Sequence, residues 1–308
     1  MLQQLTPTLY THTGDVGSTD KIFATDLDWT LIRPVHARFP KDANDWAFLP
    51  NRLITLKAYR DAGYTIAIFT NQGYKKTKLT VAISRTNNII NALLNEGINP
   101  WVFAATNSDI YRKPEKGMWD IFEANMNPID KNESLYVGDA AGRPQDHSDA
   151  DILFAQNVGL AFFTPEEVYP NNRIYIPQEQ TMFIFVGMPG ASKTTYFKEN
   201  LEPLGWVHAN QDILKTHAKV LSTVKQALAN GKSVAIDATN PSLDKRHEYV
   251  MLASQYAVPT LIIYFVRNGY DYNKLRDKPV PDIAYNVYFK NLIEPREDLD
   301  YVPVVEIF

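Results

Sequence analysis

Cysteine is absent from the 308-residue chain, which excludes disulfides, thiolate metal sites and a cysteine nucleophile. Long apolar runs are also missing, and none approaches the ~20 residues that a membrane-spanning helix needs. The first residues have neither the basic region nor the apolar stretch of a signal peptide. We therefore expect a soluble, intracellular protein that does not act at a membrane.

An excess of positive charge is the third feature that the sequence lacks. The formal net charge is −4, from 31 Lys and Arg against 35 Asp and Glu. No overall field attracts nucleic acid, so any such contact must come from local basic patches with a short footprint. The chain has 45% apolar residues, enough for buried cores, and its length suggests two domains on a prior of ~150 residues each.

The first stretch with clear chemistry is an acid pair, Asp26 and Asp28, directly after the apolar residues 21–25. In an open α/β sheet, ligands bind outside the carboxyl ends of the strands. The two carboxylates point to the same side while the chain is extended. Such a pair can hold a divalent metal, with one member as nucleophile and the other handling a proton. An isolated Asp-x-Asp is also common as a helix cap or in a loop.

Three later stretches favour the chemical interpretation, because each places polar groups after an apolar run. They contain Thr70, Lys113 and Asp139. In that order, the four motifs resemble those of the haloacid dehalogenase phosphatase superfamily. A wider set resembles the phosphatase domain of polynucleotide kinase 3′-phosphatases: Phe39-Pro40, Asp45-Trp46, Thr70, Tyr111-Arg112-Lys113-Pro114, Gly117-Met118-Trp119 and residues 137–144. Between these motifs, apparent strands and helices alternate to about Phe163, which predicts a largely parallel sheet with helices on both faces.

A polar segment over residues 164–181, broken by three prolines, predicts the domain boundary. An apolar strand over residues 182–186 follows, and residues 187–195 then nearly fit the phosphate-binding loop G-x-x-x-x-G-K-[ST]. Small residues let backbone N–H groups face a phosphate, and the next helix directs its N-terminus at the anion. The departure is Ser192, where the pattern has glycine. We predict domains at residues 1–170 and 178–308.

The second domain resembles the 5′-kinase domain of the same polynucleotide kinase family. The matching stretches are Gly187-x-Pro189-Gly190-Ala191-x-Lys193, Asn210-x-Asp212, Val234-Ala235-Ile236-Asp237-x-Thr239-Asn240-Pro241 and Arg246-x-x-Tyr249-Val250. The resemblance runs from about Phe23 to Phe308, in the order phosphatase then kinase. That is the order of the eukaryotic-type enzymes. The chain before Lys21 is too short for the forkhead-associated domain that those enzymes often carry, so we expect that domain to be lacking.

For the phosphatase half, the resemblance implies that Asp26 is the nucleophile that forms an aspartyl phosphate and that Asp28 is the general acid–base. Thr70 and Lys113 would bind the transferring phosphoryl group. Mg²⁺ would be held by Asp26, the Asp28 carbonyl and Asp139. Asp146 and Asp151 would be supporting carboxylates. Asn71 and Lys75 would contact substrate, although the basic run at Lys75, Lys76 and Lys78 also fits a solvated charged face.

For the kinase half, the resemblance implies that Lys193 and Thr194 are the phosphate-loop residues, with Thr194 on Mg²⁺. Asp212 would be the general base toward a 5′-hydroxyl. Arg246 would contact the acceptor phosphate, and Arg276 would belong to a lid over ATP. The arginine usual beside that aspartate is Gln211 here. The predicted ATP-binding set is Gly187, Gly190, Ser192, Lys193, Thr194 and Arg276.

The sequence therefore predicts an α/β protein with two doubly wound domains and a bifunctional enzyme that heals nucleic-acid ends with Mg²⁺ and ATP. Its expected partners are DNA ends in preference to RNA ends, and a ligase that joins the products. We expect a monomer, nuclear or located at sites of repair. The alternatives are RNA end repair by the same chemistry, a small-molecule phosphatase fused to a metabolite kinase, and a scaffold with degenerate sites.

Overall fold

The computed structural model describes residues 1–73, 79–126, 128–170 and 174–308. The chain divides into two compact units, Met1–Pro170 and Asn171–Phe308, and each is described by itself. Among the described residues, no helix combines the length and the apolar character that crossing a membrane requires.

The first unit is built on a seven-stranded sheet in the order β1-β2-β7-β6-β3-β8-β9. Neighbouring strands from β7 to β9 pair in parallel, whereas β1 and β2 add an antiparallel edge. The parallel part confirms the predicted doubly wound fold. The strands span Gln3–Thr6 (β1), Leu9–His12 (β2), Ile22–Thr25 (β3), Thr65–Asn71 (β6), Trp101–Ala105 (β7), Leu135–Val137 (β8) and Ala161–Phe163 (β9).

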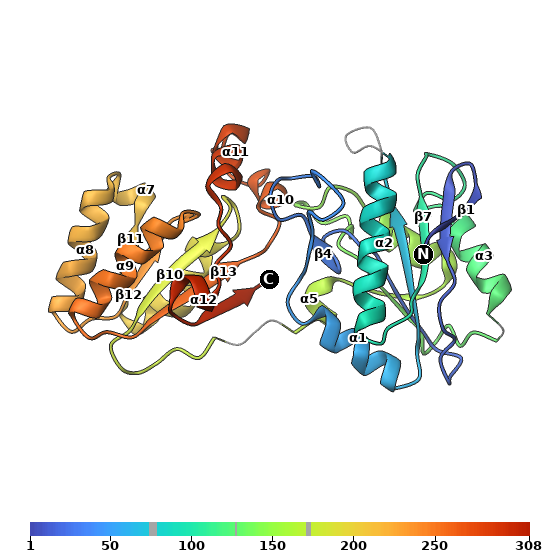
Figure 1. The fold of residues 1–308 in the computed structure, drawn as a ribbon, viewed down its shortest axis with the longest axis horizontal. Coiled ribbons are helices and arrows are strands. Elements are labelled where there is room, and N and C mark those ends of the chain that lie inside the picture. The colour runs from blue at the N-terminus through green and yellow to red at the C-terminus, as the bar shows by residue number, and fades with distance from the viewer. Residues whose placement is uncertain (74–78, 127, 171–173) are drawn as a thin grey trace. The chain divides into compact units, whose positions relative to one another are not determined.

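Helices cover both faces of this sheet (Figure 1). One core packs Phe69 and Phe103 against Trp119 and Phe154 of α3 and α4, and the other packs Ile68 against α1 and α2. The helices span Arg52–Asp61 (α1), Leu79–Asn95 (α2), Gly117–Asn125 (α3), Ala150–Val158 (α4) and Pro165–Val168 (α5). A small hairpin of β4 (Ile32–Arg33) and β5 (Ala47–Phe48) follows the acid pair.

The sequence of residues 1–20 has few long apolar runs and predicts an irregular lead-in with one strand around Leu9-Tyr10. The structure differs from this expectation. The segment forms the β1–β2 hairpin, and Leu9–His12 extends the main sheet by pairing with β7. The first of these strands is exposed at the sheet edge and therefore has no alternating apolar pattern that sequence reasoning can detect. The place of the hairpin is decided by the pairing of β2 with β7, which is a tertiary contact.

The second unit has a five-stranded, fully parallel sheet in the order β11-β12-β10-β13-β14. Its strands are Met182–Gly187 (β10), Val207–Asn210 (β11), Val234–Asp237 (β12), Thr260–Phe265 (β13) and Val304–Ile307 (β14). Its α-helices are Lys193–Tyr196 (α6), Gln211–Leu214 (α7), His217–Ala229 (α8), Leu243–Gln255 (α9), Gly269–Asn273 (α10), Asp282–Asn291 (α11) and Glu297–Asp300 (α12). In both units, the polar motifs come at the carboxyl ends of neighbouring parallel strands, the edge where such sheets bind ligands.

Candidate active sites

The core of the first site is a buried lysine between two carboxylates. Lys113 Nζ lies 2.6 Å from Asp26 Oδ1 and 2.7 Å from Asp151 Oδ1, and it donates to the Tyr136 hydroxyl at 2.9 Å. Asp26 follows β3, Tyr136 lies on β8 and Asp151 on α4, so tertiary packing brings together residues far apart in the chain. The structure thus places the predicted nucleophile and the predicted phosphoryl-binding lysine in direct contact.

Burial and charge shift the titration of this cluster. Burial raises the pKa of Asp26 to about 7, against the attraction of Lys113 and with the repulsion of Asp151. Burial alone would lower the pKa of Lys113, but Asp151 and Asp26 together raise it. Two carboxylates share one cation, so the cluster carries an excess of negative charge that a bound cation can neutralise.

Asp28, the second acid, does not contact the lysine in this way. Its carboxylate forms a bidentate ion pair with Arg85, in which Nη1–Oδ1 is 2.7 Å and Nη2–Oδ2 is 2.8 Å. Gln72 Nε2 also donates to Oδ2 at 2.9 Å. Burial would raise the pKa of Asp28, but Arg85 and Gln72 lower it. Sequence reasoning missed both Arg85 and the role of Gln72, since an arginine inside a helix carries no motif.

Thr70 and Asn71 end β6 beside the acid pair. The buried Thr70 hydroxyl accepts from Gln72 Nε2 at 2.8 Å. The amide of Asn71 donates to the Lys113 carbonyl at 3.0 Å and accepts from the Lys113 N–H at 2.9 Å. Asn71 therefore holds the lysine loop in place, while its substrate contact stays a prediction.

Asp139 completes the carboxylate set. Its N–H donates to the Thr30 hydroxyl at 3.1 Å. One ligand atom from each of Asp26, Asp139 and Asp151 lies within 4.8 Å of the others, which suits a hard cation bound by oxygen. The structure thus adds Asp151 to the predicted ligands. Asp146 instead accepts from the backbone N–H groups of Ala141 and Arg143 and supports this loop.

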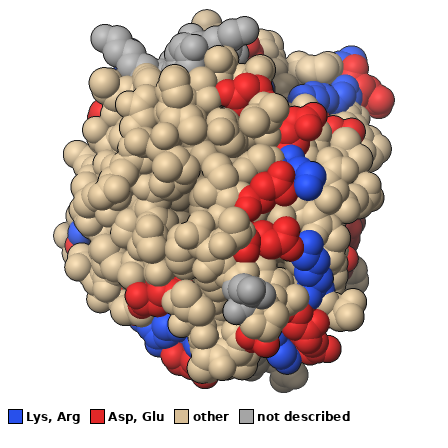
Figure 2. Space-filling view, turned by 90° about the vertical axis from the view of Figure 1, so that its right-hand side faces the viewer, with Lys and Arg blue, Asp and Glu red and all other residues tan. Residues whose placement is uncertain are grey.

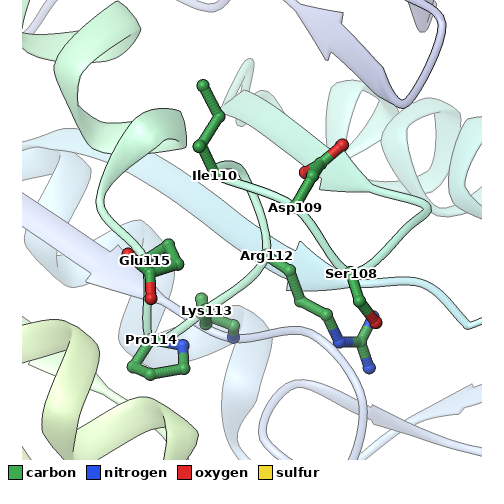
Figure 3. Close-up of a pocket in the computed structure, with 7 residues that line it drawn as sticks. All are labelled: Ser108, Asp109, Ile110, Arg112, Lys113, Pro114 and Glu115. Atoms are coloured by element: carbon green, nitrogen blue, oxygen red, sulfur yellow. The ribbon is translucent and has the colours of Figure 1, made fainter.

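A pocket of about 470 Å³ adjoins the lysine loop (Figure 3). Polar and charged side chains line it, among them the half-buried Arg112. Its lining residues are Ser108, Asp109, Ile110, Arg112, Lys113, Pro114 and Glu115. Lys75, the other predicted substrate contact, lies outside the described residues.

The second site is the loop between β10 and α6. Lys193 is buried, and its Nζ donates to the carbonyls of Gly187 and Met188, both at 2.8 Å. Burial lowers the pKa of Lys193 to about 8, against the attraction of Asp237 and Asp212 and with the repulsion of Arg276. Gly190 has φ +81°, and a Cβ there would lie 2.3 Å from the Gly269 carbonyl oxygen, so this position requires glycine.

Ser192 adopts the left-handed conformation that glycine would favour, with φ 67° and ψ 18°. Arg267 Nη1 donates to its hydroxyl at 3.4 Å. The departure from the loop pattern therefore leaves the loop geometry intact but places a serine in a strained region.

Asp237 at the end of β12 is the residue of this site that we did not assign from sequence. It accepts from the Thr194 hydroxyl at 2.7 Å, His208 Nε2 at 2.9 Å and Asn210 Nδ2 at 2.7 Å. Burial would raise the pKa of Asp237, but these donors and Lys193 lower it. The sequence contains a signal for Asp237, because this residue ends the apolar run Val234-Ala235-Ile236 in one of the stretches that match the kinase family.

Asp212 lies on α7 and Arg276 in the segment after α10, and both side chains are exposed. The charge of Asp212 raises the pKa of Lys193 and the charge of Arg276 lowers it, whereas the roles of these two residues as base and lid arginine stay predictions. Asn210 caps α7 by accepting from the Ile213 N–H at 3.0 Å, and this orients the turn that carries Asp212.

The prediction for Arg246 is wrong. Its side chain is 0% exposed, and its guanidinium forms a bidentate pair with Asp300, at 2.7 Å for Nε–Oδ1 and 3.1 Å for Nη2–Oδ2. It also donates to the Pro241 carbonyl at 2.9 Å. An acceptor phosphate cannot reach a guanidinium that is enclosed in this way. Its position in the motif reflects packing of α9 against α12.

Fold and sites define a two-unit phosphoryl-transfer protein: a haloacid dehalogenase-type phosphatase fold, followed by a phosphate-loop kinase fold. The family model for the polynucleotide kinase 3 phosphatase matches residues 21–169. A bifunctional polynucleotide phosphatase/kinase of Schizosaccharomyces pombe is 31% identical over 96% of this chain and 81% of its own. The polynucleotide 3′-phosphatase ZDP of Arabidopsis thaliana is 36% identical over 50% of this chain and 24% of its own. The chain belongs to the bifunctional polynucleotide phosphatase/kinase family, as the motifs predicted.

Proposed function

We propose that this chain heals nucleic-acid ends: residues 1–170 remove 3′-phosphates, and residues 178–308 phosphorylate 5′-hydroxyls with ATP. The observation that carries the proposal is the cluster of Asp26, Lys113 and Asp151 beside Asp28. A carboxylate nucleophile, a fixed cation and a second acid at one strand end are the parts that phosphate-ester hydrolysis through a covalent intermediate needs.

In the phosphatase reaction, Asp26 attacks phosphorus, the bond to the 3′ oxygen breaks, and Asp28 protonates that oxygen. Water then attacks the aspartyl phosphate, Asp28 takes its proton, and phosphate leaves as Asp26 is regenerated. Lys113 and Thr70 bind the phosphoryl oxygens in both steps. The short Lys113–Asp26 contact supports this assignment, because the lysine adjoins the oxygen that attacks.

Mg²⁺ fits the carboxylates of Asp26, Asp139 and Asp151. The resemblance to the family adds the Asp28 carbonyl as a further oxygen that would bind the ion. When bound, it would neutralise charge on the phosphoryl oxygens. Such a cation also offsets the surplus of carboxylates over lysine in this cluster.

In the kinase reaction, the phosphate loop positions ATP and Asp212 accepts the proton of the 5′-hydroxyl. Lys193 supplies charge to the phosphates, and Arg276 closes on them from the exposed segment after α10. Thr194 would hold Mg²⁺ through its hydroxyl oxygen. Asp237 accepts a hydrogen bond from this hydroxyl and so orients it. Ser192 keeps its backbone N–H for the phosphate cradle.

The proposed substrates are DNA ends in preference to RNA ends, with a ligase acting on the products of a monomeric enzyme at sites of repair. Charge supports a short footprint. In the view of Figure 2, acidic and basic residues are interleaved, and no broad basic patch is seen on that face. A short footprint suits recognition of a terminus over a long duplex.

End-group analysis tests the proposal. Oligonucleotides with 3′-phosphate or 5′-hydroxyl ends, as DNA and as RNA, are incubated with Mg²⁺, with and without ATP. We expect 3′-phosphate loss without ATP, and 5′-phosphate gain only with ATP, both faster on DNA. Faster reaction on RNA would favour RNA end repair. Activity on sugar phosphates or nucleosides without action on either oligonucleotide would favour the pair of metabolic enzymes and contradict the proposal.

A further inference from the structure

Arg85 is a buried cation on α2 that reaches the carboxylate of Asp28 in the phosphatase site, and no motif accounts for it. The helix buries an apolar stripe that includes Ala82, Ile89 and Leu93, and Arg85 lies among these positions. Its side chain is only 3% exposed. An unpaired cation in such a stripe would be strongly destabilising, so its partner explains its presence.

That partner is the carboxylate of Asp28, which is itself 32% exposed. A hydrogen bond of 2.8 Å from Nη2 to Oδ2 and an ion-pair contact of 2.7 Å between Nη1 and Oδ1 hold both oxygens of the carboxylate against the guanidinium. Oδ2 accepts from Arg85 Nη2 and from Gln72 Nε2, whereas Oδ1 has the ion-pair contact with Nη1 and no hydrogen bond from the described residues. Oδ1 therefore has the free lone pair that proton transfer requires.

Gln72 links this pair to the phosphate-binding hydroxyl. Its Nε2 donates to Asp28 Oδ2 at 2.9 Å and to Thr70 Oγ1 at 2.8 Å, which uses both hydrogens of one amide nitrogen. Its Oε1 accepts from Arg85 Nη2 at 3.4 Å. Arg85, Gln72, Asp28 and Thr70 thus form one connected network, in which Arg85 contacts the acid directly and Gln72 is the residue that contacts Thr70.

We propose that Arg85 is a positioning residue for the phosphatase reaction. It holds Asp28 so that Oδ1 gives a proton to the leaving 3′ oxygen as the P–O bond breaks and later takes one from water. The inference rests on the proposed function. It goes beyond it in naming a residue outside the four motifs that sets the geometry of proton transfer.

The test compares leaving groups under single-turnover conditions, with the full-length protein in excess over substrate and Mg²⁺ present. One substrate is a 3′-phosphorylated oligonucleotide, whose alkoxide leaving group needs a proton. The other is p-nitrophenyl phosphate, whose phenolate leaves without one. Misplacing the acid should slow oligonucleotide dephosphorylation about 100-fold in Arg85→Met, and slow p-nitrophenolate release less than about threefold. Arg85→Lys should recover part of the loss.

Asn88→Ala is the matched control. Asn88 lies one turn further along α2, and its amide donates to the Ala43 carbonyl at 3.0 Å and to Asn44 Oδ1 at 2.9 Å. Its loss removes polar contacts of the same helix without touching Asp28, so both rates should stay at the wild-type level. Kinase activity of every variant reports the integrity of the second unit, and circular dichroism with thermal melting reports folding.

Equal slowing of both substrates by Arg85→Met, or no slowing of either, would overturn the inference. If Arg85→Met does not fold, Arg85→Gln decides the matter, because it removes the charge that holds Asp28, leaves Gln72 and Thr70 in place, and should show the same selective loss. A wild type that hydrolyses p-nitrophenyl phosphate but not the oligonucleotide would instead contradict the proposed function. Glycerol 1-phosphate, an alkyl phosphate, then replaces the oligonucleotide in the same comparison.

Discussion

The two sites of this chain solve the same problem, stabilising a phosphoryl group, with opposite electrostatic arrangements. In the first unit, Lys113 contacts two carboxylates, and Asp28 has its own arginine. In the second unit, Lys193 donates only to backbone carbonyls among its described hydrogen bonds, and burial lowers its pKa. Under the proposed function, the phosphatase site contains its own acidic partner, the nucleophile Asp26, whereas the kinase lysine would take its anion from the nucleotide.

The largest effect expected from this difference is on the covalent nucleophile. Asp26→Asn should lower 3′-phosphate removal by about 10⁴-fold or more, because an amide is a far poorer nucleophile than a carboxylate. Phosphorylation of 5′ ends should remain near wild type, since the second site has its own chemistry. Both activities are measured on the same oligonucleotide ends.

Lys193→Ala is the reciprocal control and should remove kinase activity alone. Loss of both activities in a folded Asp26→Asn protein would refute the model of two independent sites.

A second prediction tests whether the ion pair of Arg246 with Asp300 contributes to stability alone, unlike the ion pairs in the phosphatase site. Arg246→Met should lower the free energy of unfolding by about 3–5 kcal/mol, because it leaves the carboxylate of Asp300 buried without its cation. Denaturant titration followed by kinase assay measures both stability and activity. If Arg246→Met is as stable as the wild type and loses only affinity for the acceptor end, Arg246 does contact the acceptor phosphate and the structural role is wrong.

The pH dependence of ATP binding tests the lowered pKa of Lys193, which donates to backbone carbonyls and not to a carboxylate among its described hydrogen bonds. Burial lowers the pKa of this lysine to about 8 in the free protein. Under the proposed function, ATP binds the charged form. The dissociation constant for ATP should therefore be flat below pH 8 and rise about tenfold per pH unit above it. Isothermal titration calorimetry across this range provides the measurement. Binding to Lys193→Ala should be weak and flat, and a flat profile for the wild type would contradict the lowered pKa.

The smallest effect concerns Ser192. Glycine relieves the strain of a positive φ but adds freedom to the unfolded chain, so Ser192→Gly should gain at most about 1 kcal/mol of stability. The KM for ATP should stay the same or fall slightly. Thermal melting and ATP titration measure the two effects. A large loss of kinase activity would mean that the hydroxyl, which accepts from Arg267, contacts nucleotide or metal.

Local patterns predicted much of the fold. Apolar runs marked most of the parallel strands. The residues Leu79, Ile83, Ile90 and Leu94 recur at helical spacing in the sequence, which predicts a helix where α2 lies. The exposed strand β1 escaped, because an edge strand without an apolar face has no readable period. Motif spacing also identified the acid pair and the phosphate loop, since each needs consecutive residues at the end of a strand.

The sequence by itself determined the family, the two sheet folds and the residues that chemistry requires to be adjacent in the chain, because these are local properties of backbone and motif. Only the tertiary structure decided which distant charges meet. It paired Asp28 with Arg85 and Lys113 with Asp151, and it enclosed Arg246 against Asp300. Whether a buried arginine binds substrate or a carboxylate depends on contacts between elements, and a linear pattern does not encode which elements will pack together.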